Sequence, residues 1–278
     1  MRIIKKRGYF YLQHSFRKDG KVVTEEKYLG KEIPKNIGRL KIVLEEKAKQ
    51  ELYKKLEKIK GNFQKEWVRY PKTIKNKIFE ELAIAFTYNT NAIEGSTITL
   101  EEAREILHDK IAPNKPLRDV KETEKHYYIF LKMLNKKEKL ANNLLLKWHK
   151  EVFGETKADI AGKYRDYLVR IGDYRAPDWQ DVKNLMNKLI IFINKAKINP
   201  VELSARAHYK FEKIHPFGDG NGRIGRLLIN YILWHNNYPM LVIEYKKRRS
   251  YYKALQKNEE GFVRYFIRRY LAVHKKRS

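Results

Sequence analysis

The segment from His215 to Arg226 reads HPFGDGNGRIGR, and its composition decides which fold the surrounding chain can adopt. It contains four of the 14 glycines in a chain of 278 residues. Apolar residues before it repeat at the spacing of a helix, at Leu203, Ala207, Phe211 and Ile214. Apolar residues after it do the same, at Ile224, Leu227, Leu228 and Tyr231. We therefore expect a loop that joins two helices.

The polar residues of this loop are those of a phosphate site. Its glycines and Asn221 tolerate positive φ, so that several backbone N–H groups can point at one anion. The helix that follows adds its positive end, and Arg223 and Arg226, three residues apart, can both face the anion. Asp219 offers a hard oxygen ligand for Mg²⁺. His215 is a candidate base.

Other glycine-rich sites fit these residues less well. The sequence GNGRIG at 220–225 matches the GxGxxG pattern of dinucleotide sites, but that pattern must follow a buried strand, and a helical pattern precedes it here. A calcium loop that starts at Asp219 fails because Arg223 stands at its fifth position. The chain has no GxxxxGK[ST] sequence. A simple helix–loop–helix corner needs glycines, but it does not need histidine, aspartate, asparagine and two arginines together.

At these residues the chain resembles the Fic family of the Fic/Doc superfamily, whose core motif is HPFx[DE]GNGRxxR. Every defined position of that motif is met, by His215, Pro216, Phe217, Asp219, Gly220, Asn221, Gly222, Arg223 and Arg226. The resemblance extends over about residues 75–272. It implies an all-α helical bundle of the Fic fold and a nucleotidyltransferase that moves AMP from ATP to a Ser, Thr or Tyr hydroxyl of a protein.

The resemblance also implies a role for each residue of the loop. His215 would take the proton from the target hydroxyl, and Asp219 would hold Mg²⁺ between the α- and β-phosphates of ATP. Phosphate would be bound by Gly218, Gly220, Asn221, Gly222, Arg223 and Arg226, with the two arginines at the β- and γ-phosphates. A histidine with an ordinary pKa of about 6.5 suits a base near neutral pH.

A second motif lies upstream of the loop. Thr90 to Gly95 reads TNAIEG and matches the inhibitory motif [ST]xxxE[GN] of the family, so the resemblance implies an inhibitory helix over about 73–95 whose Glu94 pairs with Arg226. Glu94 is also unusual on local grounds, because an acid in the last turn of a helix stopped by Gly95 faces the unfavourable end of the helix dipole. The alternative is a solvated surface glutamate.

The stretch from Gly162 to Pro177, GKYRDYLVRIGDYRAP, is similar to the hairpin flap of the family. The resemblance implies that this flap, including Gly162, Tyr164 and Arg165, docks a segment of the target protein by strand addition. The alternation from Tyr164 to Ile171 predicts a short strand or hairpin there.

Downstream, RSYYKALQKNEEG at 249–261 resembles the adenine-side helix of the family. Tyr251 and Tyr252 would then stack on the base, with core packing as the alternative. We interpret His149, on an amphipathic helix, as structural.

The chain divides into two predicted parts. Residues 1–35 form an N-terminal β-hairpin extension with a turn at Asp19-Gly20, and residues 36–278 form the helical domain. The expected helices cover 37–60, 73–94, 118–136, 141–153, 179–197, 200–214, 223–235, 247–257 and 259–274, with another start capped at Thr99. Gly61-Asn62 is expected to end the first helix, and a glycine-rich hairpin lies within 154–178.

The composition limits the class of protein. The net charge of +28 favours polyanionic partners, although a lysine- and glutamate-rich surface of a heat-adapted protein gives the same excess. The absence of cysteine excludes disulfides, thiol catalysis and cysteine-ligated zinc. No apolar run reaches the ~20 residues of a membrane span, and the N-terminus does not resemble a secretory signal. We expect a cytoplasmic protein without a membrane partner.

Three functional alternatives stay open. The same site could remove AMP from a modified protein, with Glu94 orienting a water molecule, or it could use another nucleotide such as UTP. From a different class, the basic and aromatic hairpin at 1–35 would suit a nucleic-acid-binding protein, whereas a packing or oligomer element is its bland alternative. The expected partners are ATP and a hydroxyl-bearing target protein, which can be the chain itself, with a homodimer as an open option.

Overall fold

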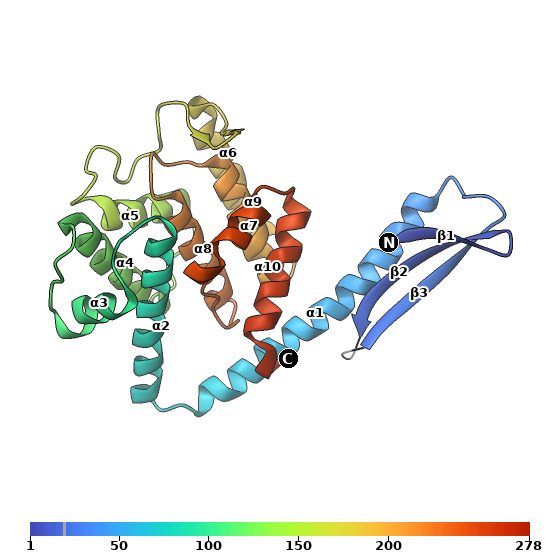
Figure 1. Cartoon of the computed structure of the whole chain (residues 1–278), viewed down its shortest axis with the longest axis horizontal. Helices are drawn as coiled ribbons and strands as arrows, with labels where there is room; N and C mark the ends of the chain where they lie inside the picture. The colour runs from blue at the N-terminus through green and yellow to red at the C-terminus, as the bar shows by residue number, and fades with distance from the viewer. Residues whose placement is uncertain (19–20) are drawn as a thin grey trace. The chain divides into compact units, whose positions relative to one another are not determined.

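The computed structural model describes residues 1–18 and 21–278 (Figure 1). These residues fall into two compact units, one made of 1–62 with 276–278 and one made of 63–275. Helices dominate the chain, with a small N-terminal sheet and one short hairpin, as the sequence predicts. The predicted turn at Asp19-Gly20 lies outside the described residues.

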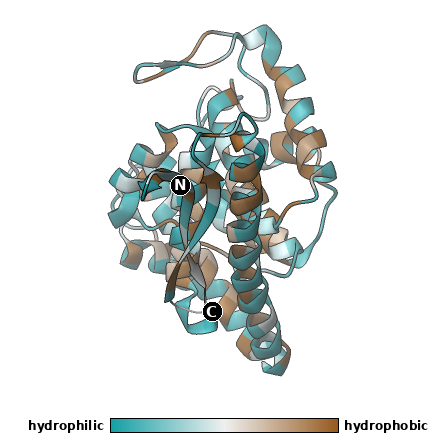
Figure 2. Ribbon diagram, turned by 90° about the vertical axis from the view of Figure 1, so that its right-hand side faces the viewer, coloured by the Kyte–Doolittle hydropathy of each residue, from teal (hydrophilic) through white to brown (hydrophobic). Residues whose placement is uncertain are grey.

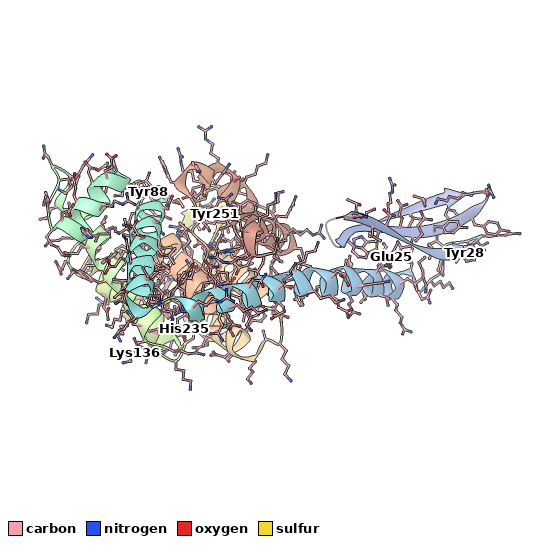
Figure 3. The ribbon with its side chains drawn as sticks, turned by 90° about the horizontal axis from the view of Figure 1, so that it is seen from below. Glu25, Tyr28, Tyr88, Lys136, His235 and Tyr251 are labelled. Atoms are coloured by element: carbon pink, nitrogen blue, oxygen red, sulfur yellow. The ribbon has the colours of Figure 1, made fainter. Side chains whose placement is uncertain are left out.

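The N-terminal unit contains a three-stranded antiparallel sheet in the order β1–β2–β3. Its strands are β1 (Arg2–Lys6), β2 (Tyr9–Lys18) and β3 (Lys21–Gly30). The predicted hairpin is β2–β3, and β1 is an additional strand. Arg7 and Gly8 join it to β2 and both have positive φ, +46° and +85°, which suits the twist of a two-residue hairpin turn. Figure 3 labels Glu25 and Tyr28 on β3, where the Tyr28 ring lies 5.4 Å from that of Tyr11.

Helix α1 (Ile37–Arg69) is longer than expected. The prediction that Gly61-Asn62 ends it is wrong, because the helix continues to Arg69 and stops before Pro71. One glycine inside a helix costs only about 1 kcal/mol relative to alanine. Packing of Trp67 offsets that amount, since its ring centroid lies 5.1 Å from that of Phe79 and 5.5 Å from that of Trp234.

The second unit is a bundle of helices around α8 (Figure 1). Its helices are α2 (Lys72–Ile93), α3 (Leu100–Arg104), α4 (Leu117–Asn135), α5 (Asn142–Phe153), α6 (Trp179–Lys195), α7 (Pro200–Ile214), α8 (Asn221–His235), α9 (Arg248–Leu255) and α10 (Glu259–Val273). The helices predicted in this region are confirmed to within a few residues. Helix α8 contacts α2, α4, α5 and α7, and twelve of its fifteen residues are buried, as expected for a central helix.

The flap region contains one short antiparallel pair of strands, β4 (Arg170–Ile171) and β5 (Tyr174–Arg175). The longer strand predicted from Tyr164 to Ile171 forms only at its last two residues. The preceding backbone is used elsewhere, because the N–H of Arg165 donates to the carbonyl of Pro216 at 2.9 Å. The flap is therefore mostly an irregular segment fixed to the loop after α7.

Most helices carry both hydrophobic and hydrophilic residues, as the brown and teal colours in Figure 2 show. This pattern lets each helix bury one face while the other faces solvent. In residues 1–18 and 21–278, every helix is too short or too polar to cross a membrane.

The start of α3 offers a test of the local rules that shape this fold. Thr99 and Glu102 form a reciprocal capping box, in which the Thr99 hydroxyl accepts from the N–H of Glu102 and the carboxylate accepts from the N–H of Thr99. We expect Thr99→Ala to lower the free energy of unfolding by about 1 kcal/mol, measured by urea denaturation. Thr99→Asp, which can still cap, should stay near the parent value. Equal losses in both variants would contradict a capping role.

Candidate active site

The loop between α7 and α8 is fixed by its own side chains. His215 ends α7 in the left-handed region at φ +50°, and Gly220 has φ +75° just before α8 begins. Both polar ends of the Asn221 side chain bond to the backbone of Phe217, each at 2.8 Å. The resemblance implies that this side chain binds phosphate. In the structure it instead holds the loop closed through these two bonds.

The first turn of α8 is an anion position, and a carboxylate occupies it. A Cβ atom on Gly222 would overlap Oε1 of Glu94, so this carboxylate lies directly against the backbone there. The N-terminal N–H groups of a helix have no intrahelical partners and carry a partial positive charge. The position therefore favours negative charge. Position 220 requires glycine for a different reason, because a side chain there would overlap the ring of Phe153.

Glu94 also forms an ion pair with Arg226, with 2.5 Å between Oε1 of Glu94 and Nη2 of Arg226. The Arg226 guanidinium is only 2% exposed, and it also donates to the hydroxyl and the carbonyl of Thr90 at 2.7 and 3.1 Å. Burial alone would lower the pKa of Arg226, but the neighbouring carboxylate outweighs it and the pKa is raised. The structure thus brings together the three side chains that the sequence analysis grouped from two distant motifs.

The end of α2 sets the position of Glu94. Gly95 adopts φ +90°, its N–H donates to the carbonyl of Ala92 at 3.1 Å, and the N–H of Ser96 donates to that of Asn91 at 3.0 Å. These two bonds form a Schellman motif. Glu94 is consequently the C-cap residue, directly after Ile93, where the dipole disfavours an acid. Its pairing with Arg226 and with the start of α8 offsets that disadvantage.

His215 has the environment of a neutral base. Burial is the main cause that lowers its pKa, and the nearby cation Arg165 lowers it further. Its Nδ1 is buried and has no hydrogen-bond partner within the described part of the chain. At neutral pH the imidazole is therefore uncharged and can accept a proton.

Asp219 lies half-exposed at the edge of the loop. Its Oδ2 is 2.6 Å from Nζ of Lys157 and 3.6 Å from Nη2 of Arg223. Burial would raise the pKa of Asp219, but these two cations outweigh it and the pKa is lowered, so the group is a carboxylate.

A single carboxylate beside a phosphate site suits Mg²⁺, which usually combines one or two carboxylates with substrate phosphates. Across residues 1–18 and 21–278, no three acidic or histidine side chains converge to form a cage for a metal ion. Asp219 therefore fits the metal-ligand role only together with a phosphorylated ligand.

Sequence reasoning missed two residues of this network, Glu122 and Lys157. Nζ of Lys157 lies 2.9 Å from Oε1 of Glu122, and Arg223 forms an ion pair with Oε2 of the same carboxylate. The sequence could have revealed Glu122, because an acidic residue on the buried face of a helix is unusual. It could not have revealed Lys157, because this residue lies in an irregular turn. The pairing also turns Arg223 toward α4, whereas Arg226 faces α2, so the two arginines do not point the same way.

His149 on α5 connects the loop to the flap. Its Nδ1 accepts a hydrogen bond from the N–H of Gly162 at 2.9 Å, so Nε2 carries the proton and donates to the carbonyl of Asp219 at 3.0 Å. The ring also stacks on that of Phe217, with 4.0 Å between centroids. This geometry agrees with a structural role for His149. It fixes the backbone carbonyl of Asp219, the residue whose side chain is the candidate metal ligand.

The flap residues differ in how they are used. The Arg165 guanidinium is buried and donates to the carbonyls of His215, Tyr167 and Pro177 at 2.8, 2.7 and 2.6 Å. It was expected to help dock a target, but this side chain is fully engaged within the chain. Tyr164 is also partly buried, and burial raises the pKa of its hydroxyl. A Cβ on Gly218 would overlap the Tyr167 hydroxyl, so the flap covers this side of the loop.

The two candidate base-stacking tyrosines have different surroundings. Tyr251 is fully buried, its hydroxyl lies 2.7 Å from Nε2 of His208, and Figure 3 shows it among the helices. For Tyr251 the packing alternative therefore holds. Tyr252 is 41% exposed, and its hydroxyl donates to the carbonyl of Ile93 on α2 at 3.2 Å. Of these two rings, that of Tyr252 is the one open to a base.

Comparison with known proteins gives a consistent match. The model of the Fic/DOC family matches residues 139–233. A "Protein adenylyltransferase Fic" of Nematostella vectensis is 33% identical over 71% of this chain and 47% of its own length. "Protein adenylyltransferase fic-1" of Caenorhabditis elegans is 30% identical over 74% of this chain and 42% of its own length. This chain therefore spans less than half of these relatives.

Solved structures share the fold. A structure of Fic-1 from C. elegans matches with a TM-score of 0.73 and 26% identity, over 88% of this chain and 77% of that one. A Fic-domain signalling protein from Bacteroides thetaiotaomicron matches with a TM-score of 0.69 and 23% identity, over 80% and 95%. The second likeness concerns the fold alone.

The buried titratable groups predict how stability depends on pH. Burial lowers the pKa of His149 to about 4 and those of His126 and His208 to about 3. The unfolded chain takes up these protons near pH 6.5, so stability should fall as pH drops from 6.5 toward 4, by about 1.4 kcal/mol per pH unit for each histidine. Glu212 opposes this trend, because burial raises its pKa to about 8.

In urea titrations across this pH range, His149→Gln should make the dependence shallower and Glu212→Gln should make it steeper. Identical slopes in parent and variants would contradict the assignment of these groups.

Proposed function

This chain belongs to the Fic/DOC family, and on that premise we propose that it transfers AMP from Mg²⁺–ATP to a hydroxyl group of a protein. The names of its adenylyltransferase relatives and the geometry around α8 support this proposal. The proposal includes inhibition of the same site by Glu94 of the chain itself.

The occupied anion position is the observation that carries the proposal. The Glu94 carboxylate lies against Gly222 and pairs with Arg226 at 2.5 Å. A γ-phosphate needs the same contacts, because both anions prefer a helix N-terminus and a guanidinium. Glu94 and the γ-phosphate therefore exclude each other, and ATP binds productively only when Glu94 has moved.

The transfer requires one bond to form and one to break. The target oxygen attacks the α-phosphorus, its proton passes to the imidazole of His215, and pyrophosphate leaves with the electrons of the broken phosphoanhydride bond. The lowered pKa of His215 keeps the ring able to accept that proton at neutral pH. The bonds from Arg165 and the left-handed conformation hold the ring at the end of α7.

The remaining charges are met by groups already at the site. Asp219 would hold Mg²⁺ together with the phosphates of ATP, and that ion would supply positive charge to the leaving group. The backbone N–H of Gly222 would face the phosphates, whereas that of Gly220 donates to Oδ1 of Asp219 at 2.5 Å, and Arg223 and Arg226 would neutralise the β- and γ-phosphates. Tyr252 is the side chain that we assign to the adenine face.

Removal of AMP is a second candidate activity, favoured by one observation. The Glu94 side chain keeps 27% of its surface exposed while it lies at the phosphate position. A carboxylate in that place can orient a water molecule for attack on a phosphoryl bond. The use of UTP, a homodimer and a nucleic-acid partner for residues 1–35 stay predictions.

We expect Glu94→Gly to increase transfer of label from α-³²P-ATP, including self-labelling. The gain should be about ten- to a hundredfold, because a hydrogen bond to a charged group is worth about 1.5–3 kcal/mol. Glu94→Gln should give a smaller gain, since it keeps the shape but removes the charge. Glu80→Gln, an exposed change on the same helix, is the matched control. Adding His215→Ala should abolish labelling.

Two outcomes would contradict the proposal. Equal labelling by the parent and Glu94→Gly would exclude autoinhibition, and labelling that survives His215→Ala would exclude the base. The same variants separate the two directions of reaction. If Glu94 orients water, Glu94→Gly should stop the release of AMP from a modified protein while it increases the addition.

A further inference from the structure

A groove of about 480 Å³ lies between α6 and α7, outside the phosphate site. Its apolar lining comes from three segments of the chain, through Tyr174, Pro177, Leu185, Leu189, Phe192 and Tyr209. Leu185, Leu189 and Phe192 recur at helical spacing on one face of α6. The groove is thus an apolar trough that could hold a side chain of a partner.

Three lysines border this trough, and they differ in their pairing. Lys210 is neutralised by Glu259, with 2.8 Å between Nζ and Oε2. Lys213 lies over the rings of Tyr174 and Tyr209, at 4.2 and 5.4 Å from their centroids. Burial lowers the pKa of Lys213, which means that its ammonium group is poorly solvated.

Neither Lys188 nor Lys213 forms an ion pair among the described residues, and burial raises the pKa of the neighbouring Glu212 carboxyl to about 8, so that this group is mostly neutral at pH 7. A partly desolvated cation without a carboxylate attracts an anion from outside, and the second unpaired lysine adds to that attraction. The groove therefore combines an apolar floor with unmet positive charge at its border.

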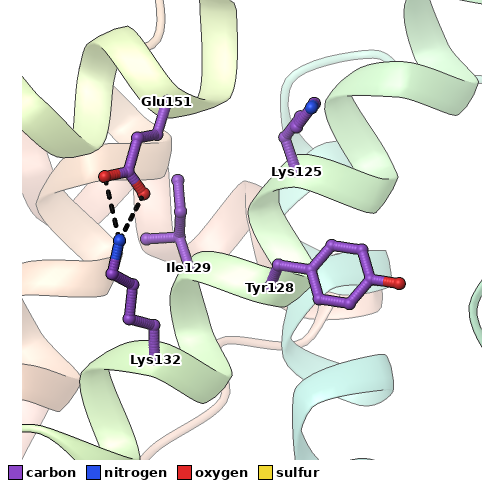
Figure 4. A pocket seen from close by; sticks show the side chains of 5 residues that line it. All are labelled: Lys125, Tyr128, Ile129, Lys132 and Glu151. Atoms are coloured by element: carbon purple, nitrogen blue, oxygen red, sulfur yellow. Dashed lines mark hydrogen bonds and ion pairs between the residues drawn. The ribbon is translucent and has the colours of Figure 1, made fainter.

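Another surface pocket shows why unpaired charge matters here. The pocket of about 320 Å³ in Figure 4 is also bordered by lysines, on α4. There Lys132 is paired with Glu151 at 3.1 Å and Lys125 with Glu155 at 2.6 Å. Its lysines are already neutralised by carboxylates of the same chain, so this pocket attracts an anionic partner less strongly.

The groove is also joined to the candidate active site. Ile214 lines the groove, and His215 is the next residue. Pro177 lines it too, and its carbonyl accepts the same Arg165 guanidinium that bonds to the carbonyl of His215. A segment seated in the groove would consequently lie within a few residues of a hydroxyl presented to His215.

We propose that the groove between α6 and α7 docks an acidic segment of the acceptor protein that carries one apolar anchor residue near the modified hydroxyl. The anchor fills the trough, and the acidic side chains pair with Lys188 and Lys213. This inference rests on the proposed function for the identity of the acceptor, but docking in the groove does not require AMP transfer. A nucleic acid fits less well, because the two tyrosine rings on which bases would stack, Tyr174 and Tyr209, are partly buried and already lie under the ammonium group of Lys213.

The first test measures binding without transfer. The probe is a short fluorescent peptide with one threonine, one leucine and several glutamates, titrated by anisotropy with the full chain carrying His215→Ala. Lys188→Glu combined with Lys213→Glu should weaken binding at least about fivefold. The matched control, Lys183→Glu with Lys139→Glu, changes the net charge equally at exposed positions away from the groove. It should bind within about twofold of the parent, because distant exposed charges are screened by salt.

Lys188→Glu alone, at an exposed position, guards against misfolding of the double variant and should show part of the loss. The same peptide with lysines in place of glutamates should bind more weakly than the acidic one. The proposal is overturned if the acidic and basic peptides bind equally, if the control double variant loses as much affinity, or if a single-stranded oligonucleotide binds in the groove and the peptides do not.

A second measurement connects docking with transfer. In the Glu94→Gly background, Lys188→Glu should raise KM for the acidic acceptor peptide and leave kcat nearly unchanged, because the residue contacts the docked segment and not the reacting atoms. A fall in kcat at constant KM would contradict docking. Absence of AMP transfer to any acceptor would instead refute the proposed function, and the anisotropy result would still decide whether the groove binds.

Discussion

Arg226 is a buried cation in the second turn of α8, and much of the site is arranged around its need for an anion. Removing one partner of a buried ion pair typically costs about 3–5 kcal/mol, because the remaining charge is left without compensation. Glu94 satisfies this need from the end of α2, where its own helix dipole disfavours it. A phosphate could satisfy it equally. In the proposed function, Glu94 and a nucleotide phosphate are therefore alternative occupants of one electrostatic position, and no separate inhibitory pocket is required.

The second arginine of the motif belongs to a balanced network. Arg223 and Lys157 supply two positive charges, and Glu122 and Asp219 supply two negative charges. Because this network is already neutral, a divalent cation at Asp219 alone would leave excess positive charge. The charge of a triphosphate removes that excess. If Asp219 holds Mg²⁺ as proposed, these charges favour binding of metal and nucleotide together, with the ion replacing Lys157 at the carboxylate.

Periodicity and local patterns predict the helices and the capped start at Thr99, and the resemblance to the Fic family predicts the grouping of Thr90, Glu94 and Arg226. They failed where tertiary contacts overrule local preference. Aromatic packing at Trp67 carries α1 through Gly61, and the fully buried Tyr251 packs on His208. Sequence patterns also give no sign of Lys157, whose role depends on a turn that folds back onto α4 and the loop. The glycines illustrate the same limit, since Gly220 makes room for Phe153 as well as allowing its positive φ.

Arg165 shows how a single buried side chain couples the parts of the site. It is 4% exposed and, among the described residues, its guanidinium bonds to four backbone carbonyls from the end of α7 and from the flap. Every residue has a backbone carbonyl, so these hydrogen bonds of Arg165 could not be predicted from the sequence. They stabilise the left-handed conformation of His215, which is unfavourable for a residue other than glycine by roughly 1–2 kcal/mol. The Arg165 guanidinium also bonds to the carbonyls of Pro177 and Ile214, which line the groove. A partner bound in the groove would therefore contact residues that the same side chain holds in place next to the candidate base.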